Sequence, residues 1–520
     1  MPKNKIKNAH KLKNGWRWLL AASLVLTSCS DVWENHYAAD PSINGKTLMD
    51  VLLEDSTLTS FARMLETTGA DTTYLRSSQA FTVWAPVNSA LTDFVWSDTA
   101  AMRILVKNHI ARYSIPTASV TDKRIYMLNG KFIRFNQIGS NFAFGGETLL
   151  SGEAIAQNGV LHKLPHVIPF SSNIWEYMNK NAEMDSIKKF LYSFDVNSFD
   201  EKTSVKLGVD QKGKSIYDST FIYSNVQLKR LGLLSTEDSL YTAILPTNTA
   251  WREAYTRIRP FYKSNAADSL RDSIQNVHAK LALTRDLVFR GVMEPEMISS
   301  SESDSIFSTT GNDFNAPSRL FAGATPHTVS NGKVYTTNQL YFNAWESWQK
   351  PIVLEAENSL GREAYLCNVY SRTTYDSWLK GISDQKYLLV SPTTSSAKPQ
   401  MTFSIPNTLS ATYNVYCVFV PGNVADTTIK NETTKVYFEL TYLNNLGVST
   451  SIRLIKPTIR ITSPTAITKM FVYKITFPFA NYNELITTVK LKVYSDVATN
   501  ETSIYTRRMR IDCLLLEPVH

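Results

Sequence analysis

FTVWAPVNSAL, at residues 81–91, and YTAILPTNTAW, at residues 241–251, are the two stretches that decide the fold. They align without a gap, and in each an apolar run ends at a proline, with an asparagine two positions later. Proline ends a strand ladder because it has no N–H, and asparagine is a good helix N-cap. We therefore predict that each stretch is a buried β-strand followed directly by a helix, and that the chain contains this unit twice.

Matching elements surround both copies of this box. Each copy opens with an amphipathic helical pattern, continues after the box with a second helical pattern, and closes with an Asn-Gly turn before an alternating strand. The matched pairs are 47–67 with 174–194, 101–113 with 278–290, and 157–168 with 330–340. The repeat therefore extends over the first two thirds of the chain.

These residues resemble the fasciclin domain, whose hallmarks are a TVFAPTNxAF-like box, a helix containing His-Ile, and a closing NGVIHxID-like box. In the first copy they correspond to residues 82–91, to the helix around His109, and to residues 158–162. The second copy keeps only the box and the Asn-Gly turn, and it carries polar insertions at 200–238 and 296–318. The resemblance implies compact β-sandwich and helix modules of extracellular adhesion and binding proteins, which are not generally enzymes.

From Pro351 onward, short alternating strands rich in Thr, Val, Ile, Tyr and Phe take over, as a half-buried sheet favours. We predict strands at 386–390, 400–405, 413–420, 436–443, 469–477, 489–494 and 508–516. Such a series predicts a β-sandwich. The stretches SATYNVYCVF, at 410–419, and IDCLLLEP, at 511–518, resemble two strands of galactose-binding-like jelly rolls, which often bind sugars.

The predicted fold class is α+β, with two tandem fasciclin-like β-sandwich and helix domains followed by an all-β jelly-roll sandwich. The predicted segments are a signal peptide at 1–28, a tether at 29–45, fasciclin-like domains at 46–170 and 173–342, and the sandwich at 350–520.

The N-terminus predicts export and lipid attachment at Cys29. A basic segment, 1–17, precedes a short apolar run, 18–26, which is the layout of a secretory signal. The run is shorter than the ~20 apolar residues needed to span a bilayer. It ends in Leu-Thr-Ser-Cys, which resembles the bacterial lipobox, and each buried acyl CH₂ stabilises membrane attachment by ~0.8 kcal/mol. The alternative is a plain signal peptide with a cysteine near the cut by chance.

The charge and the cysteines exclude several classes of partner. The formal net charge is +8, but residues 1–28 hold six basic and no acidic residues, so the remainder carries only +2. We therefore predict no nucleic-acid partner. Cys367, Cys417 and Cys513 form no CxxC pair, so we expect no structural zinc site. Cys417 and Cys513 could form one disulfide or remain two buried thiols.

We predict no catalytic residue, no metal site and no cofactor. His162 and His166 lie in an extended pattern, where positions i and i+4 are about 13 Å apart. His109, on an apolar helical face, is expected to pack and form hydrogen bonds. Glu355 and Glu357 would share one face of a strand, about 6.6 Å apart, which falls at the short end for an inverting glycosidase. A solvated strand edge is the alternative, as is the structural xExE strand of carbohydrate-binding jelly rolls, which sometimes has bound calcium.

Four aromatic residues near the last boundary are the candidate ligand-binding residues: Trp345, Trp348, Tyr375 and Trp378. Exposed rings there could stack on sugars or anchor a protein partner, and packing against the linker is the alternative. The domain order resembles that of Bacteroidota lipoproteins, and Ser30-Asp31 partly resembles their surface-export signal.

We therefore predict a non-enzymatic lipoprotein of the outer membrane, exposed at the cell surface, which serves binding or adhesion. The resemblance implies that it accompanies a SusC/SusD-type importer of glycans or peptides. A periplasm-facing orientation, a structural adhesin and a glycan-active enzyme remain alternatives.

Overall fold

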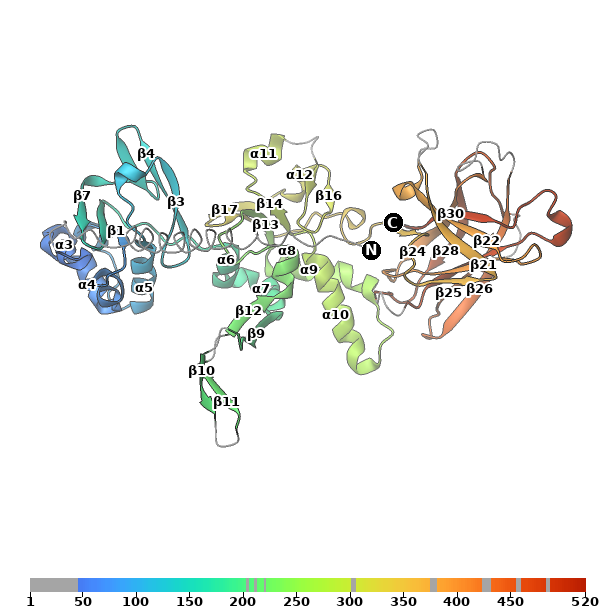
Figure 1. Ribbon diagram of the computed structural model, residues 1–520, viewed down its shortest axis with the longest axis horizontal. Coiled ribbons are helices and arrows are strands. Elements are labelled where there is room, and N and C mark those ends of the chain that lie inside the picture. Colours follow the sequence, from blue (N-terminus) through green and yellow to red (C-terminus); the bar gives the residue numbers. More distant parts are fainter. Residues whose placement is uncertain are drawn as a thin grey trace, which may run out of the picture. The chain divides into compact units, whose positions relative to one another are not determined.

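The computed structural model describes residues 45–202, 205–209, 213–218, 221–300, 305–374, 381–422, 432–454, 460–482 and 487–520. The chain divides after Asn173 into two compact units (Figure 1). The predicted signal peptide and Cys29 lie outside the described residues. Within the described ranges, no helix is both long and apolar enough to cross a membrane.

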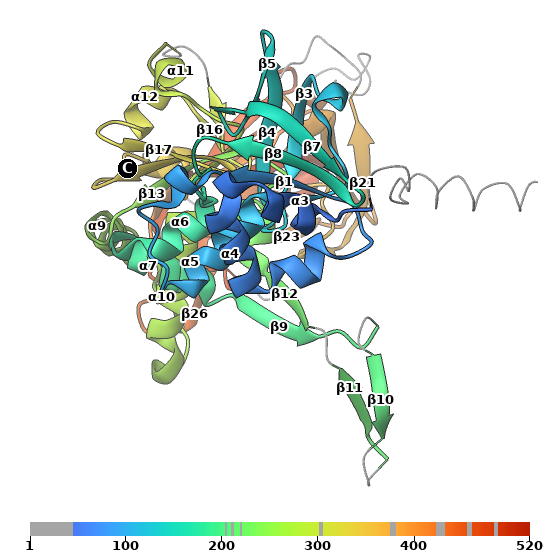
Figure 2. The ribbon, with the colours of Figure 1, turned by 90° about the vertical axis from the view of Figure 1, so that its left-hand side faces the viewer.

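The first unit is built on a four-stranded sheet in the order β2-β1-β8-β7. These strands are β1 (Phe81–Pro86), β2 (Ile110–Arg112), β7 (Leu150–Ala156) and β8 (Gly159–Leu164). Helices α3 (Leu48–Glu54), α4 (Thr59–Thr68) and α5 (Thr99–Asn108) lie on one side of it (Figure 2). A second sheet contains β3 (Asp122–Tyr126), β4 (Phe132–Ile138), β5 (Asn141–Phe144) and β6 (Glu147–Thr148).

Strand β1 is buried along its whole length because both of its faces are covered. Phe81 and Val83 belong to the core under the helices, whereas Trp84 belongs to the core under the second sheet. The Trp84 ring stacks on Phe144 with 4.1 Å between centroids and meets the edge of Phe135 at 5.5 Å. A strand with two apolar faces has a nearly continuous apolar sequence, which is why this stretch of the sequence stands out.

The second unit begins with the same arrangement of strands. Its sheet has the order β14-β13-β18-β17, and β13 is parallel to β18 as β1 is to β8. These strands are β13 (Tyr241–Pro246), β14 (Val288–Arg290), β17 (Thr325–Val329) and β18 (Gly332–Thr337). Its main helices are α6 (Ile174–Lys180), α7 (Asp185–Tyr192), α8 (Val226–Leu231), α9 (Asn248–Ile258) and α10 (Asp268–Thr284), with the shorter α11 (Pro295–Ser300) and α12 (Pro317–Leu320).

The Asn-Gly turns of the two copies make the same hydrogen bonds. Asn158 accepts from the N–H of Leu48 at 2.7 Å, and Asn331 accepts from the N–H of Ile174 at 2.9 Å. Each amide nitrogen donates to two carbonyls of the loop that leads into the central strand. A buried asparagine thus satisfies the first helix and this loop together, which explains why the sequence repeats it.

The asparagine of the box begins the helix that follows, as predicted, but its side chain does not cap that helix. Thr247 is the N-cap of α9. Asn248 instead accepts from the N–H of Ser186 at 2.8 Å and donates to the Ala182 carbonyl at 2.9 Å. Asn88 binds the opening helices of the first copy in the same way. The side chain therefore joins two elements that are distant in sequence, which a local pattern does not show.

Several predicted helices are shorter than their periodicity indicates. The opening patterns at 47–67 and 174–194 are each broken into separate short helices. The patterns at 101–113 and 278–290 end as edge strands, because the chain turns at His109 into β2 and after α10 into β14. Short apolar runs fit helix and strand equally well, so the periodicity could not decide between them.

The insertion at 200–238 contributes to a β-arm. Its strands are β9 (Asp195–Phe199), β10 (Val205–Val209), β11 (Ser215–Asp218) and β12 (Phe221–Asn225), paired as β9 with β12 and β10 with β11. The arm extends away from the helices and sheet of its copy (Figures 1 and 2). Val196 and Phe199 keep 55% and 43% of their surfaces exposed, so the arm presents apolar side chains.

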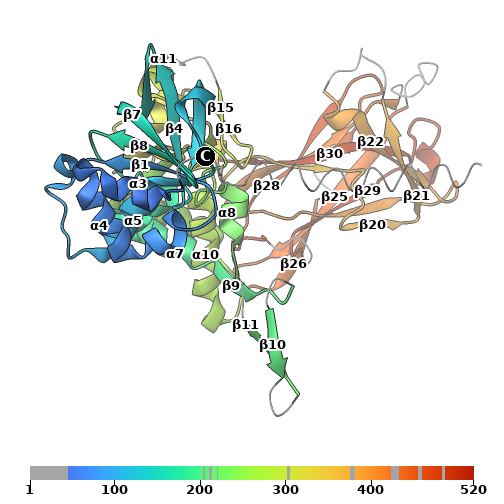
Figure 3. The ribbon, with the colours of Figure 1, turned by 60° about the vertical axis from the view of Figure 1, so that its left-hand side comes forward.

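Two packed sheets form the C-terminal sandwich (Figure 3). The first contains β21 (Cys367–Thr373), β22 (Lys386–Pro392), β30 (Met509–Pro518), β24 (Thr412–Phe419) and β28 (Thr468–Thr476), with β19 (Ile352–Glu355) also beside β30. The second contains β20 (Arg362–Tyr365), β23 (Gln400–Ser404), β29 (Lys490–Ser495), β25 (Lys435–Leu443) and β26 (Ser449–Leu454), with β27 (Arg460–Ile461) beside β25. The predicted fold class is therefore confirmed.

One hydrophobic core continues from the second copy into the sandwich. A single cluster of buried side chains extends from Ile174 to Leu516. Backbone hydrogen bonds cross the junction, from Ser410 N–H to the Phe261 carbonyl and from Ala480 N–H to the Lys263 carbonyl, both at 2.8 Å. The domain boundaries drawn from the sequence stay predictions, and the continuous core was not among them.

Candidate functional site

A pocket of about 440 Å³ lies where the second copy meets the sandwich, and we call it the junction pocket. Helices α8 and α10 and the turn η6 (Arg259–Tyr262) line it on one side, and residues 407–409 with Tyr482 line it on the other. Its rings are Tyr262, His278, Trp348 and Tyr482. Ligand sites have volumes of about 300–1,000 Å³, so a sugar-sized or peptide-sized group fits here.

The aromatic wall of the junction pocket is a connected set of rings. His278 stacks on Tyr482 with 3.8 Å between centroids, and Tyr262 lies parallel to His278 at 6.4 Å. Burial raises the pKa of Tyr262 to about 12 and lowers the pKa of His278. Both rings are therefore neutral at pH 7, and the wall itself carries no charge.

Three cationic side chains complete the junction pocket: Arg230, Arg285 and Lys350. Lys350 lies 3.2 Å from Asp313, but the side chains of Arg230 and Arg285 form no hydrogen bond or ion pair with any described residue. Burial, and next the like charge of Arg285, lower the pKa of Arg230. Since no acidic residue is among the described residues that line the pocket, its charge is positive.

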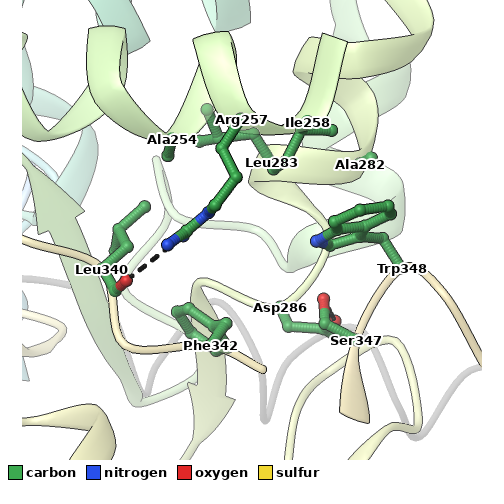
Figure 4. Close-up of a pocket in the computed structure, with 10 residues that line it drawn as sticks. All are labelled: Ala254, Arg257, Ile258, Ala282, Leu283, Asp286, Leu340, Phe342, Ser347 and Trp348. Carbon is green, nitrogen blue, oxygen red and sulfur yellow. Dashed lines mark hydrogen bonds between the residues drawn. The ribbon is translucent and has the colours of Figure 1, made fainter. Parts of the chain in front are cut away.

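The carboxylate of Asp286 lines a separate, water-sized hole of about 10 Å³ beside the junction pocket (Figure 4). Ser308, Thr310 and Ser347 donate to it at 2.7, 2.7 and 2.5 Å, and Asn312 donates at 2.9 Å. Neutral donors therefore satisfy this buried carboxylate. Because its hydrogen-bonding capacity is used there, Asp286 forms no ion pair with its neighbour Arg285.

The structure places two of the four predicted ligand-binding residues, Trp345 and Trp348, in different surroundings. Trp348 is buried and lines the junction pocket, with its ring 4.7 Å from Phe261. Trp345 is 51% exposed and its ring lies 5.2 Å from His520, outside the pocket lining. Tyr375 and Trp378 lie outside the described residues. A ligand-binding role for these side chains stays a prediction.

Glu355 ends β19, Glu357 lies just beyond it, and both are half-buried with their charges acting on Asp512. Among the described residues β19 pairs only with β30, so the strand edge stays a prediction. A β-bulge in β30 sets Asp512 and Cys513 opposite Val418 of β24, and Cys513 pairs with Glu355 of β19. One carboxylate oxygen of each glutamate is buried without a hydrogen-bond partner. Burial, and then the charges of Glu355 and Glu357, raise the pKa of Asp512 to about 7. Protonation of Asp512 is therefore one way to reduce the charge repulsion among Asp512, Glu355 and Glu357.

A cation could also neutralise this acidic cluster, because carboxylate oxygens are the ligands that calcium prefers. Among the described residues, however, no group of three His, Cys, Asp or Glu side chains is arranged to hold a metal ion. The cluster therefore does not fit a metal site as it stands.

The cysteines of the described residues are free thiols, so the disulfide alternative does not occur in this structure. Cys417 is fully buried in the sandwich core, and burial raises its pKa well above the usual value. Burial also raises the pKa of Cys513 to about 12. Both thiols therefore have structural roles and are poor nucleophiles.

His109 packs and forms hydrogen bonds, as predicted. Its Nδ1–H donates to the Leu105 carbonyl at 2.8 Å, and its Nε2 accepts from the N–H of Ile168 at 3.0 Å. Complete burial lowers its pKa to about 4, so the ring is neutral. His162 is also buried, against Trp84, whereas His166 is exposed beside Glu147. The two histidines therefore do not form a metal pair.

Comparison with known proteins finds a similarity within the first unit. A family model described as the fasciclin domain matches residues 56–169. This segment is therefore similar to the fasciclin domain. No curated protein is significantly similar to the chain in sequence.

Solved structures are similar to other parts of the chain. A fasciclin-domain pair of the insect cell adhesion molecule fasciclin I covers 56% of this chain and 99% of its own, at 13% identity and a TM-score of 0.21. A xylan-binding domain from Paenibacillus barcinonensis covers 32% of this chain and 93% of its own, at 11% identity and a TM-score of 0.21. A Clostridium thermocellum xylanase fragment, complexed with xylohexaose, covers 32% of this chain and 28% of its own, at 12% identity and a TM-score of 0.22.

The fasciclin-like domain has a smaller hollow of its own, of about 190 Å³, between α5 and residues 68–74. Arg103 and Lys107 line it together with Tyr74. It is below the usual volume of a ligand site. The junction pocket is therefore the better candidate.

Sequence reasoning missed most of the junction pocket. Arg230 ends a short helix, Arg285 follows a long one, and Tyr482 belongs to a loop of the sandwich. They are more than 50 residues apart in pairs, and none belongs to a motif. The one signal was Trp348, an aromatic residue in a polar stretch, which proved to line the pocket.

Proposed function

We propose that this chain is a non-enzymatic, lipid-anchored protein of the outer membrane that captures a glycan or peptide at the cell surface. The observation that carries the proposal is the junction pocket, which joins an aromatic wall to cationic side chains at a ligand-sized volume. The similarity to the fasciclin domain supports it, because that family serves adhesion and binding. Titration with a panel of oligosaccharides and peptides tests it. Binding that Trp348→Ala does not weaken would place the ligand elsewhere.

The leader supports the membrane part of the proposal. Cys29 follows a basic segment and a short apolar run, and its lipidation would hold the protein on the membrane. Growth with a labelled fatty acid should label the native protein but not the Cys29→Ala variant. Protease treatment of intact cells then distinguishes the surface from the periplasm. A Cys29→Ala protein that remains labelled and membrane-bound would contradict the anchor.

The proposed partner is a SusC/SusD-type importer, to which this protein would deliver its ligand. The support is the resemblance of the domain order to Bacteroidota lipoproteins. Purification of the native complex from detergent tests the partnership. Recovery of the protein without any transporter would count against it.

A structural adhesin is the second candidate, and the β-arm favours it. Val196, Phe199 and Val209 are 55%, 43% and 58% exposed on a projecting element, as a contact surface for another protein requires. Replacing Val196 and Val209 by serine should reduce cell adhesion if the arm makes the contact. Unchanged adhesion would leave ligand capture as the function.

The enzyme alternative depends on Glu355 and Glu357. One oxygen of each glutamate is buried, and the charges of both act on Asp512. A cleavage screen on polysaccharides, with the Glu355→Gln and Glu357→Gln double variant as control, tests this alternative. Turnover that disappears in the double variant would favour it.

A further inference from the structure

We propose that the junction pocket binds an anionic sugar residue, whose carboxylate or sulfate group is held by Arg230 and Arg285. The inference rests on the proposed function only in taking this pocket as the ligand site. It adds the chemical class of the ligand, which neither the fasciclin-like domain nor the sandwich fold specifies.

The first observation is uncompensated positive charge in a concave site. Arg230 and Arg285 come from two helices, α8 and the end of α10, and meet at one pocket without an ion-pair partner among the described residues. The nearby carboxylates have other roles, since Asp286 is satisfied by neutral donors and Asp313 contacts Lys350. The charge of Asp286 acts on Arg230 without an ion pair, and it counts less there than burial and the like charge of Arg285, so a bound anion would offset the remaining cost.

The second observation is the donor geometry. A guanidinium offers a planar fork of N–H groups that matches the two oxygens of a carboxylate or a sulfate. Two such forks from different elements can hold one anionic group from two directions. This favours a group with several equivalent oxygens over a neutral hydroxyl or an amide.

The third observation is the aromatic wall of the same pocket. Tyr262, His278 and Tyr482 form a connected aromatic surface, and the apolar face of a sugar ring stacks on such a surface. The hydroxyl of Tyr482 is buried beside Ser264, and a hydrogen bond with that side chain lowers its pKa against the larger effect of burial. The wall therefore offers a sugar the faces of its rings.

Calorimetric titration of the full chain, purified in detergent, tests the inference. The probes are a galacturonate oligosaccharide, a sulfated galactose disaccharide, the neutral galactose disaccharide, and inorganic sulfate. At least one anionic sugar should bind about 10-fold or more tightly than the neutral one, because a hydrogen bond to a charged group contributes about 1.5–3 kcal/mol. The two anionic arms distinguish carboxylate from sulfate.

Arg285→Gln should weaken the binding of the anionic sugar about 10-fold or more, and Arg230→Gln serves as the independent second variant. Lys229→Gln is the control matched to Arg230→Gln, since it removes one exposed positive charge from the same helix, α8. A midpoint of thermal unfolding equal to that of the wild type shows that each variant is folded. If Lys229→Gln weakens binding as much as Arg285→Gln, the effect is long-range charge and the inference is wrong.

The remaining outcomes separate this inference from the proposed function. Equal binding of neutral and anionic sugars, lost in Trp348→Ala, would overturn the inference and leave the pocket as a ligand site. Binding of inorganic sulfate alone would also overturn it, because no sugar would then be recognised. Binding of peptides only would likewise exclude it, and no binding of any probe would count against both proposals.

Discussion

The replacement of Asp512 by asparagine should stabilise the protein more at pH 8 than at pH 5. In the folded state the carboxyl is 1% exposed and close to Glu355 and Glu357, which with burial raise its pKa to about 7 from 3.8. Between pH 3.8 and about pH 7, Asp512 keeps its proton in the folded state and releases it in the unfolded state. Stability therefore falls as the pH rises from about 4 to about 7.

The size of this effect follows from the pKa difference. About three pKa units at ~1.4 kcal/mol each give an upper limit of about 4 kcal/mol. The amide introduced by Asp512→Asn carries no charge, and its oxygen can still accept from the N–H of Ser383, as Asp512 does at 3.1 Å. The variant should thus lose the pH dependence between pH 5 and pH 8 while keeping this hydrogen bond.

Urea unfolding of the full chain at pH 5 and pH 8 measures the difference between wild type and Asp512→Asn. Asp496→Asn is the control, since it removes a carboxylate from the end of β29 without touching the acidic cluster. Comparing the variant with the wild type at each pH cancels the other titrating groups. If Asp512→Asn is equally destabilising at both pH values, or if calcium stabilises the wild type at pH 8, a proton does not neutralise the cluster.

Three further predictions test the fold. Gly332→Ala should prevent folding of residues 174–520, because its Cβ would lie 1.8 Å from the Tyr241 carbonyl oxygen. Gly291→Ala is the control: it has φ +80° but open space around its Cβ, and it should cost about 1 kcal/mol of stability. Similar losses of stability in the two variants would contradict this reasoning. The ring of His109 should stay neutral, protonated at Nδ1, in NMR spectra at pH 5.5, and stability should fall by at most about 3 kcal/mol between pH 6.5 and 4 as the unfolded state gains the proton. Cys417 should resist alkylation at pH 8 until the protein unfolds, and rapid labelling of the native state would contradict its burial.

The strands of the two boxes could be predicted from the sequence, because they are apolar on both faces and end at a proline. The Asn-Gly turns could also be predicted, since a local motif decides them. The role of Asn248 could not, because its hydrogen bonds reach Ala182 and Ser186, more than 60 residues away. Asparagine often caps a helix, so the local sequence indicated the N–H groups of the following helix as partners of Asn248 rather than Ala182 and Ser186.

The junction pocket shows the same limit more strongly. Arg230, Arg285 and Tyr482 come together only through the packing of the second copy against the sandwich. Each has an ordinary sequence context, so no periodicity or spacing indicates that they meet. The acidic cluster was half predictable, since Glu355 and Glu357 stand out, but the β-bulge that contains Asp512 leaves no signal in the sequence.

The continuous core of residues 174–520 has a consequence for how this chain can change by recombination. A crossover near Asn173 exchanges the fasciclin-like domain as an intact piece, because the compact units divide there. A crossover between Leu340 and Trp348 would pair halves of a core, and of a pocket, that had not been selected together. We expect descendants of this architecture to shuffle the first piece freely and to inherit the last two as one.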